Sequence, residues 1–182
     1  MRSGSWNSAT LAQVRTVAAA FAVLTLAASN TRAQVRPAAS PNAEPRKTWA
    51  SLSLGPATAD GRGRIGGMIA LWTAQGPLAF SIRDAGASRF LEPGDVGDIS
   101  FLAGIHPVRG RHADVVFLAG VGQSWGHTST GADLEHEPVL AASAQMNLNY
   151  VLAGVGVDAF AAFGSGRTYY GAGLALAVGW FP

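Results

Sequence analysis

The sequence contains no cysteine, and it has few charged residues. Asp, Glu, Lys and Arg together account for 13% of its 182 residues, which is about half the share in an average soluble domain. Without cysteine, the chain cannot form a disulfide framework, a cysteine-ligated zinc site or a thiol nucleophile. The shortage of charge also argues against a surface that faces water on all sides.

Lysine is the scarcest basic residue, with Lys47 as its single example, and the arginines are scattered along the chain. Three of the 13 basic residues, Arg2, Arg15 and Arg32, precede an expected cleavage point, which leaves 10 basic residues against 11 acidic ones. Proteins that bind nucleic acid need a dense group of Lys and Arg side chains to contact phosphates. The composition therefore argues against a nucleic-acid partner.

The sequence also lacks an apolar run long enough for a membrane-spanning helix. The run at residues 16–28 has 13 residues, and as a helix it would cover about 20 Å of a hydrocarbon layer of roughly 30 Å. Arginines before this run and small residues around Arg32 are typical of a cleaved secretory signal peptide, predicted to span residues 1–33. Residues 34–47 contain three prolines and are predicted to form a flexible periplasmic linker.

Glycine is abundant, with 23 residues, and stretches of alternating side chains fill the rest of the chain. In residues 138–150, Leu140, Met146 and Leu148 share one parity, while Ser143 lies on the other. A β-strand directs the two parities to opposite faces of a sheet. Eight such strands are predicted. Their expected ranges are 48–55, 63–74, 78–84, 96–106, 113–126, 138–150, 151–163 and 168–181.

The two parities indicate a barrel whose apolar side faces outward. A soluble barrel would direct its large apolar residues inward and its charged residues outward. Here the second parity carries glycine and small polar residues, which suit a narrow lumen, while the apolar parity suits lipid. We therefore predict an all-β fold, a single eight-stranded antiparallel up-and-down transmembrane β-barrel over residues 48–182. Aromatic residues near the segment ends are predicted to form girdles or, for some of them, to fill the lumen: Trp72, Trp125, Tyr150, Tyr170 and Trp180.

The connections between the strands predict an orientation. Alternate connections, at 56–62, 85–95, 127–137 and 164–167, are mostly longer than the turns between them. Outer-membrane barrels have long loops outside the cell, with short turns and both termini in the periplasm. The longer connections are therefore expected to be extracellular.

With this pattern, residues 48–182 resemble the small eight-stranded bacterial outer-membrane barrels of the OmpA-like and OmpX-like class. In that class an aromatic residue ends the last strand and is recognised by the barrel assembly machinery, and Trp180-Phe181 is similar to that signal. Pro182 departs from it and moves Phe181 to the inward parity. The resemblance implies a monomeric, non-enzymatic protein of the bacterial outer membrane, without a cofactor, that contacts lipid and lipopolysaccharide and has a structural or surface-interaction role.

Charged residues within the predicted strands are assigned to the inward parity. They are Arg64, Arg83, Asp98, Asp114 and Asp158. An unpaired charge in a narrow lumen costs several kcal/mol, so we expect an internal network, most simply Arg83 with Asp98 on the neighbouring strand. This network has two interpretations, a structural plug or an ion path with a gate. The small lumen of an eight-stranded barrel favours the plug.

The loop at residues 126–137 contains the densest reactive chemistry. His127-x-Ser129 resembles the His-x-Ser pair of lipid A 3-O-deacylases, which are small outer-membrane barrels with a later Glu. The resemblance implies that His127 acts as base on the Ser129 hydroxyl while Glu135 or Glu137 orients the imidazole. A lipid-modifying hydrolase is therefore an alternative function, and a hydrated loop is the simpler interpretation.

Two further alternatives remain open. His127, Asp133 and His136 offer imidazole and carboxylate ligands for a divalent metal, without a diagnostic spacing. His106 and His112, beside a predicted turn, are expected to be solvent-exposed.

A secreted soluble ligand-binding barrel of lipocalin-like shape would instead place large apolar residues around an internal ligand. Those residues would be Leu140, Leu148, Leu174 and Val178.

Overall fold

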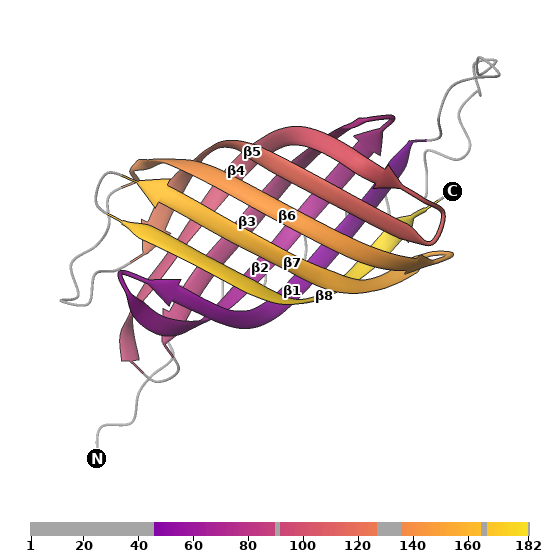
Figure 1. Ribbon diagram of the computed structural model, residues 1–182. Coiled ribbons are helices and arrows are strands. Elements are labelled where there is room, and N and C mark those ends of the chain that lie inside the picture. Colours follow the sequence, from indigo (N-terminus) through magenta and orange to yellow (C-terminus); the bar gives the residue numbers. More distant parts are fainter. Residues whose placement is uncertain (1–45, 90–91, 127–135, 165–166, 182) are drawn as a thin grey trace. The chain divides into compact units, whose positions relative to one another are not determined.

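The computed structural model describes residues 46–89, 92–126, 136–164 and 167–181, which form a closed barrel of eight antiparallel strands (Figure 1). Each strand pairs with the next in sequence, and the last pairs with the first. The strands are β1 (Lys47–Ala59), β2 (Arg62–Gln75), β3 (Leu78–Arg89), β4 (Glu92–Arg109), β5 (Ala113–Gly126), β6 (Pro138–Tyr150), β7 (Ala153–Gly164) and β8 (Thr168–Trp180). No helix in this described part is long and apolar enough to cross a membrane. The predicted all-β fold with eight antiparallel strands is confirmed.

The register between the strands sets their tilt. A path that starts at Lys47 and steps from partner to partner around the barrel returns to β1 at Ala57, ten residues further along. A stagger of ten residues over eight strands corresponds to a tilt of about 43° from the barrel axis. At this tilt a strand of the length of β1 covers about 31 Å along the axis, close to the roughly 30 Å of a hydrocarbon layer.

Alternation along each strand separates an apolar outer wall from a polar interior. In β6, Leu140 and Leu148 are 64% and 60% exposed, whereas Ser143 and Gln145 are 5% and 2% exposed. The same division occurs in β8, where Leu174 is exposed and Ala175 is buried. The predicted assignment of the apolar parity to the outside is therefore confirmed for these strands.

Several strands extend beyond their predicted ends. β3 and β4 continue through most of the predicted loop at 85–95, and only residues 90–91 separate them. The prediction of a long loop there is wrong, because the small residues that suggested a turn, such as Gly86, pair with residues of the facing strand. The predicted connection at 56–62 likewise shortens to Asp60 and Gly61, whose φ angles of 51° and 72° fit a two-residue hairpin turn.

The barrel has two distinct ends. β1 starts and β8 finishes at one of them, which we call the terminal end, and residues 127–137 connect β5 to β6 at the opposite loop end (Figure 1). The connections at 60–61, 90–91 and 165–167 are as short as the turns at the terminal end. The difference in loop length that suggested an orientation therefore rests on residues 127–137 alone.

Candidate functional site in the barrel interior

A cluster of charged side chains lies inside the terminal end of the barrel. A carboxylate oxygen of Asp114 lies 2.8 Å from Nζ of Lys47 and 2.7 Å from Nε2 of His106. The Asn149 side-chain amide donates a hydrogen bond to the same carboxylate, and Lys47 also donates to the carbonyl of Gly110 at 2.6 Å. Because the side chains of this cluster are buried, their mutual pairing offsets the cost of removing them from water.

Two members of this cluster differ from their predicted surroundings. The predicted linker ends at Lys47, but this residue begins β1 and points into the barrel, where it is 5% exposed. The prediction that His106 is solvent-exposed is wrong: it is 2% exposed because it lies on the inward parity of β4, within reach of Asp114. His112 is exposed, as predicted.

An aromatic layer covers this cluster on its inner side. The rings of Trp49 and Trp72 stack with centroids 5.7 Å apart and an interplanar angle of 2°, and Phe181 packs against Trp49 at 5.9 Å. The indole N–H of Trp49 donates to Gln145 at 2.9 Å, and that of Trp72 donates to Ser51 at 2.8 Å. Of the two interpretations of the aromatic residues, Trp72 fits the filling of the lumen, because its parity in β2 points inward. The other predicted girdle residues lie on the outward parity near strand ends: Trp125, Tyr150, Tyr170 and Trp180.

Closer to the loop end, Arg83 of β3 crosses the interior toward β6 and β7. Its Nη1 donates to the carbonyl of Ala142 and to the hydroxyl of Ser143, both at 2.7 Å. Its Nη2 donates to the carbonyl of Ala161 at 2.9 Å and lies 3.3 Å from Asp98. A side chain that is 1% exposed thereby connects strands on opposite walls of the barrel.

Asp98 is the anionic centre of this second cluster. Besides Arg83, its carboxylate accepts hydrogen bonds from the hydroxyls of Ser100 and Tyr169. The Tyr169 ring packs edge-on against Phe160, with centroids 6.3 Å apart, and the Arg83 guanidinium lies 6.0 Å from the Phe160 centroid. The carboxylate therefore has one cationic partner and two neutral donors, which is the satisfaction that a buried charge needs.

The remaining predicted lumen residues are Asp158 and Arg64. Asp158 of β7 is 3% exposed and lies opposite Gln145 of β6, but neither of its carboxylate oxygens has a hydrogen-bond partner among the described residues. Arg64 is half-buried near the loop end of β2. The structure thus joins Arg83 to Asp98, places Asp114 in a separate cluster, and leaves Asp158 beside the Ser53 hydroxyl.

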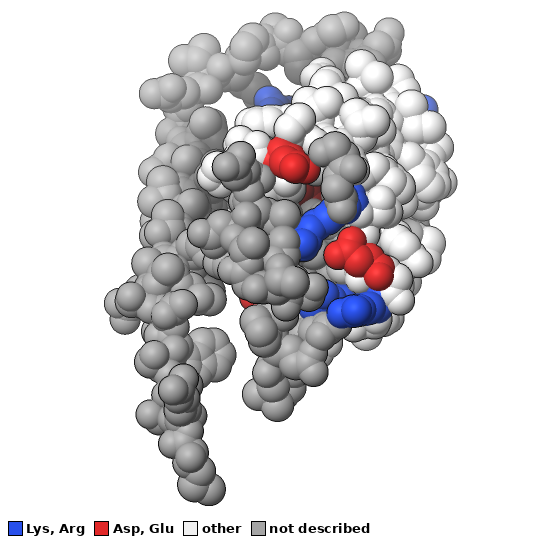
Figure 2. All heavy atoms as spheres, turned by 90° about the vertical axis from the view of Figure 1, so that its left-hand side faces the viewer, with Lys and Arg blue, Asp and Glu red and all other residues white. Residues whose placement is uncertain are grey.

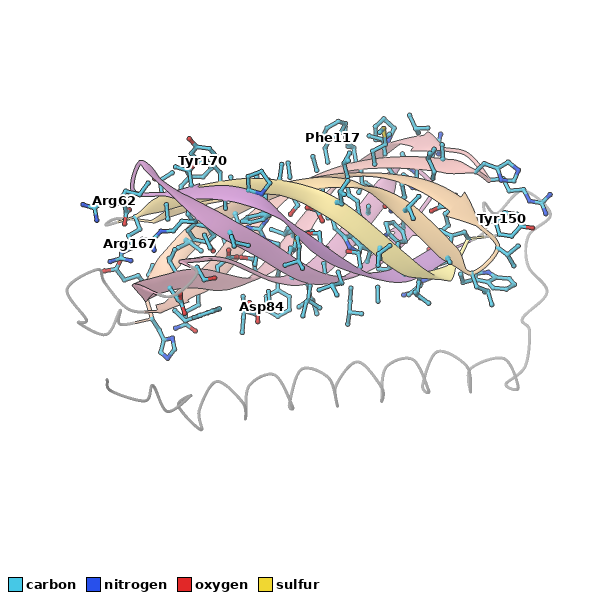
Figure 3. The ribbon with its side chains drawn as sticks, turned by 90° about the horizontal axis from the view of Figure 1, so that it is seen from below. Arg62, Asp84, Phe117, Tyr150, Arg167 and Tyr170 are labelled. Carbon is cyan, nitrogen blue, oxygen red and sulfur yellow. The ribbon has the colours of Figure 1, made fainter. Side chains whose placement is uncertain are left out.

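One charged residue within the strands lies on the outer wall. Asp84 follows the inward Arg83 in β3 and points away from the barrel (Figure 3), between Ile69 and Ile99 on the adjacent strands. The Trp125 side chain donates a hydrogen bond to the Asp84 carboxylate. The prediction that all charges within the strands face inward is therefore wrong at this position.

The predicted reactive loop lies mostly outside the described residues. This applies to His127, Ser129, Asp133 and Glu135. Glu137 is half-buried, and its backbone carbonyl accepts hydrogen bonds from the amide and hydroxyl of Ser124 at 2.9 and 3.1 Å. Among the described residues, no three His, Asp or Glu side chains gather in a way that could hold a metal ion. The deacylase and metal-site hypotheses therefore depend mainly on residues outside the described part of the chain.

Comparison with known proteins agrees with the architecture. No protein-family model matches the sequence, and no curated protein matches it. Ail, the attachment invasion locus protein of Yersinia pestis, shows 14% identity and a TM-score of 0.51 over 74% of this chain and 96% of Ail. The structure of Ail in complex with the heparin analogue sucrose octasulfate gives a TM-score of 0.50 with the same identity and coverage. Neisserial surface protein A shows 9% identity and a TM-score of 0.53 over 75% and 98% of the two chains.

The chain has the fold of the small eight-stranded outer-membrane barrels. The lipocalin-like alternative is wrong, because the four residues that it places around an internal ligand lie on the outer wall. Leu140, Leu148, Leu174 and Val178 are 64%, 60%, 76% and 57% exposed. The interior that would receive such a ligand instead contains tryptophan rings and charged clusters.

Proposed function

We propose that the protein is exported through a cleaved signal peptide and resides in the bacterial outer membrane as a monomer. The observation that carries this proposal is the apolar outer wall, on which large side chains such as Phe101, Val121 and Leu176 are more than half exposed. Soluble monomers rarely expose continuous apolar patches above a few hundred Å². An outer wall of this kind is stable in lipid, where a closed barrel also satisfies its backbone hydrogen bonds.

The interior of this barrel acts as a structural plug. Arg83 spans the lumen near one end, and the Trp49 and Trp72 rings lie above the Asp114 cluster at the other. Arg64, Asp98 and Asp158 add further charge along the same path. Side chains that hydrogen-bond across so narrow a lumen favour a plug over an ion path.

The loop end presents the surface through which the protein acts. Charged side chains gather there (Figure 2), and they include Asp60, Arg62, Asp95 and Arg167, which lie in or near three of the connecting segments. A sealed, non-enzymatic barrel acts through the surface that it presents, so we assign a structural or surface-interaction role. In this orientation the barrel assembly machinery inserts the protein from the terminal end, where Trp180 and Phe181 lie.

Cell fractionation and surface labelling test this proposal. The full chain, expressed in a Gram-negative host, should appear in the outer-membrane fraction, resist extraction by urea and show a heat-modifiable band in electrophoresis. A cysteine introduced at Gly61 at the loop end should react with an impermeant maleimide on whole cells, while one at Gly110 at the terminal end should not. Recovery as a soluble periplasmic protein would refute membrane residence, and the opposite labelling pattern would refute the orientation.

A further inference from the structure

A shallow furrow runs across the outer wall from β5 to β1. Its volume is about 770 Å³. Phe117 stands at one end of it and Tyr170 at the other (Figure 3). Alanine side chains form its floor: Ala142, Ala144, Ala159, Ala161 and Ala172. Elsewhere the outer wall carries large leucine, isoleucine, valine and phenylalanine side chains, many of them about half exposed.

The strand register explains the course of the furrow. Phe117, Ala144, Ala159 and Ala172 lie opposite one another on four consecutive strands. The furrow then reaches Pro56 in β1. Four interstrand steps span about 19 Å, and at a strand tilt of about 43° such a row rises about 13 Å along the barrel axis.

This rise matches the depth of one leaflet, which is half of a hydrocarbon layer of roughly 30 Å. The lower end of the furrow is Phe117, five residues into β5 from the terminal end, and the upper end is Pro56, near the last residues of β1. The furrow therefore runs from the interior of the bilayer to the interface at the loop end. Its dimensions suit a lipid chain from the leaflet on that side.

Positive charge lies above the upper end of the furrow. Arg62 starts β2, and Arg167 directly precedes β8, three residues before Tyr170. The turn between β1 and β2 contains one carboxylate, that of Asp60. The backbone amide of Asp60 donates a hydrogen bond to the carbonyl of Thr168 at 3.2 Å, which joins this turn to the start of β8. Figure 3 shows Arg62, Arg167 and Tyr170 at the same end of the barrel.

We propose that this furrow binds one lipid A molecule, with an acyl chain on the alanine floor and a phosphate group between Arg62 and Arg167. The inference rests on the proposed outer-membrane residence, because lipid A meets this wall only in that leaflet. Small side chains let a chain lie close to the sheet and gain dispersion contacts along its length. Guanidinium groups pair strongly with phosphate. The phosphate monoesters of lipid A carry net negative charge, whereas the phosphate of a zwitterionic lipid is balanced by the ammonium group of the same headgroup.

The test measures the lipid that stays with the barrel. The full chain is folded into vesicles of phosphatidylethanolamine with a minor share of lipid A, transferred to mild detergent, and analysed by native mass spectrometry. The Ala159→Leu/Ala161→Leu variant fills the floor, and Ala103→Leu on the outer wall of β4 is its matched control. Arg62→Gln/Arg167→Gln removes the charge, with the exposed Arg111→Gln at the terminal end as control. Each double variant should reduce retained lipid A by about threefold or more, which corresponds to about 0.7 kcal/mol, and neither control should change it.

Several outcomes would overturn the assignment. Equal retention of dephosphorylated lipid A would show that the phosphate groups do not contribute to binding, and equal retention of phosphatidylethanolamine would show that the site does not select lipid A. Unchanged retention in the alanine variant would show that the lipid does not lie in the furrow. A dimer that disappears in that variant would show that a second copy occupies the furrow. Heat modifiability of the wild type in the same vesicles separates the two proposals: a barrel that inserts without preferring lipid A refutes only this inference, whereas failure to insert refutes membrane residence.

Discussion

Arg83 is the interior side chain whose loss we expect to destabilise the barrel most. It donates to the carbonyls of Ala142 and Ala161 and to the Ser143 hydroxyl, and it pairs with Asp98. In Arg83→Met these contacts disappear and a carboxylate that is 0% exposed keeps its charge without a cation. Removing one partner of a buried ion pair costs about 3 to 5 kcal/mol, so we expect the free energy of unfolding to fall by that amount.

Asp98→Asn should cost less, because the Arg83 guanidinium keeps three hydrogen bonds to β6 and β7. The double variant Arg83→Met/Asp98→Asn leaves no charge at either position. It should therefore be more stable than the sum of the single losses predicts, with a coupling energy of about 1 to 3 kcal/mol. The exposed Arg111→Met at the terminal end is the control and should stay within about 0.5 kcal/mol of the wild type.

Urea unfolding of the four proteins in vesicles, followed by tryptophan fluorescence and by heat modifiability, measures these differences. Additive losses would show that the two residues act independently and would refute the proposed plug at this position. Single-channel recording in planar bilayers gives a second readout. If Arg83→Met raises conductance without changing the free energy of unfolding, the pair is a gate and not a plug.

Three further predictions concern the wall and the loop. Leu174→Arg on the outer wall should destabilise the barrel in lipid by about 2 to 4 kcal/mol, while the inward Ala175→Ser should have a much smaller effect; equal urea midpoints for the two variants would contradict the assignment of faces. Asp84→Leu should stabilise the barrel in vesicles by about 1 kcal/mol, because it removes a carboxylate from the lipid side, and a lower urea midpoint would show that its hydrogen bond to the neighbouring tryptophan outweighs that gain. Purified protein in lipid should release no fatty acid from lipid A, as measured by mass spectrometry of the lipid, and a release that Ser129→Ala and His127→Ala both abolish would establish the deacylase.

The sequence determined the strand count and the faces of the barrel, because both follow from local periodicity. Alternation with a period of two is a property of each strand by itself, so Leu140 and Gln145 could be assigned to opposite faces without knowing any neighbour. The same rule applied strictly would have placed Trp72 inward and Asp84 outward. The error at Asp84 and the open assignment of Trp72 came from giving the residue type more weight than its position in the strand.

The extent of the strands and the partners inside the lumen required the tertiary structure. Gly86 lies in a stretch whose composition suggests a loop, yet the facing strand supplies hydrogen-bond partners and extends the ladder through it. In the same way, nothing local to Lys47 or His106 indicates that both meet Asp114, since these residues lie on three strands and come together only when the sheet closes with a stagger of ten residues. Local side-chain pattern thus determines which way a residue faces, and barrel closure determines what it meets there.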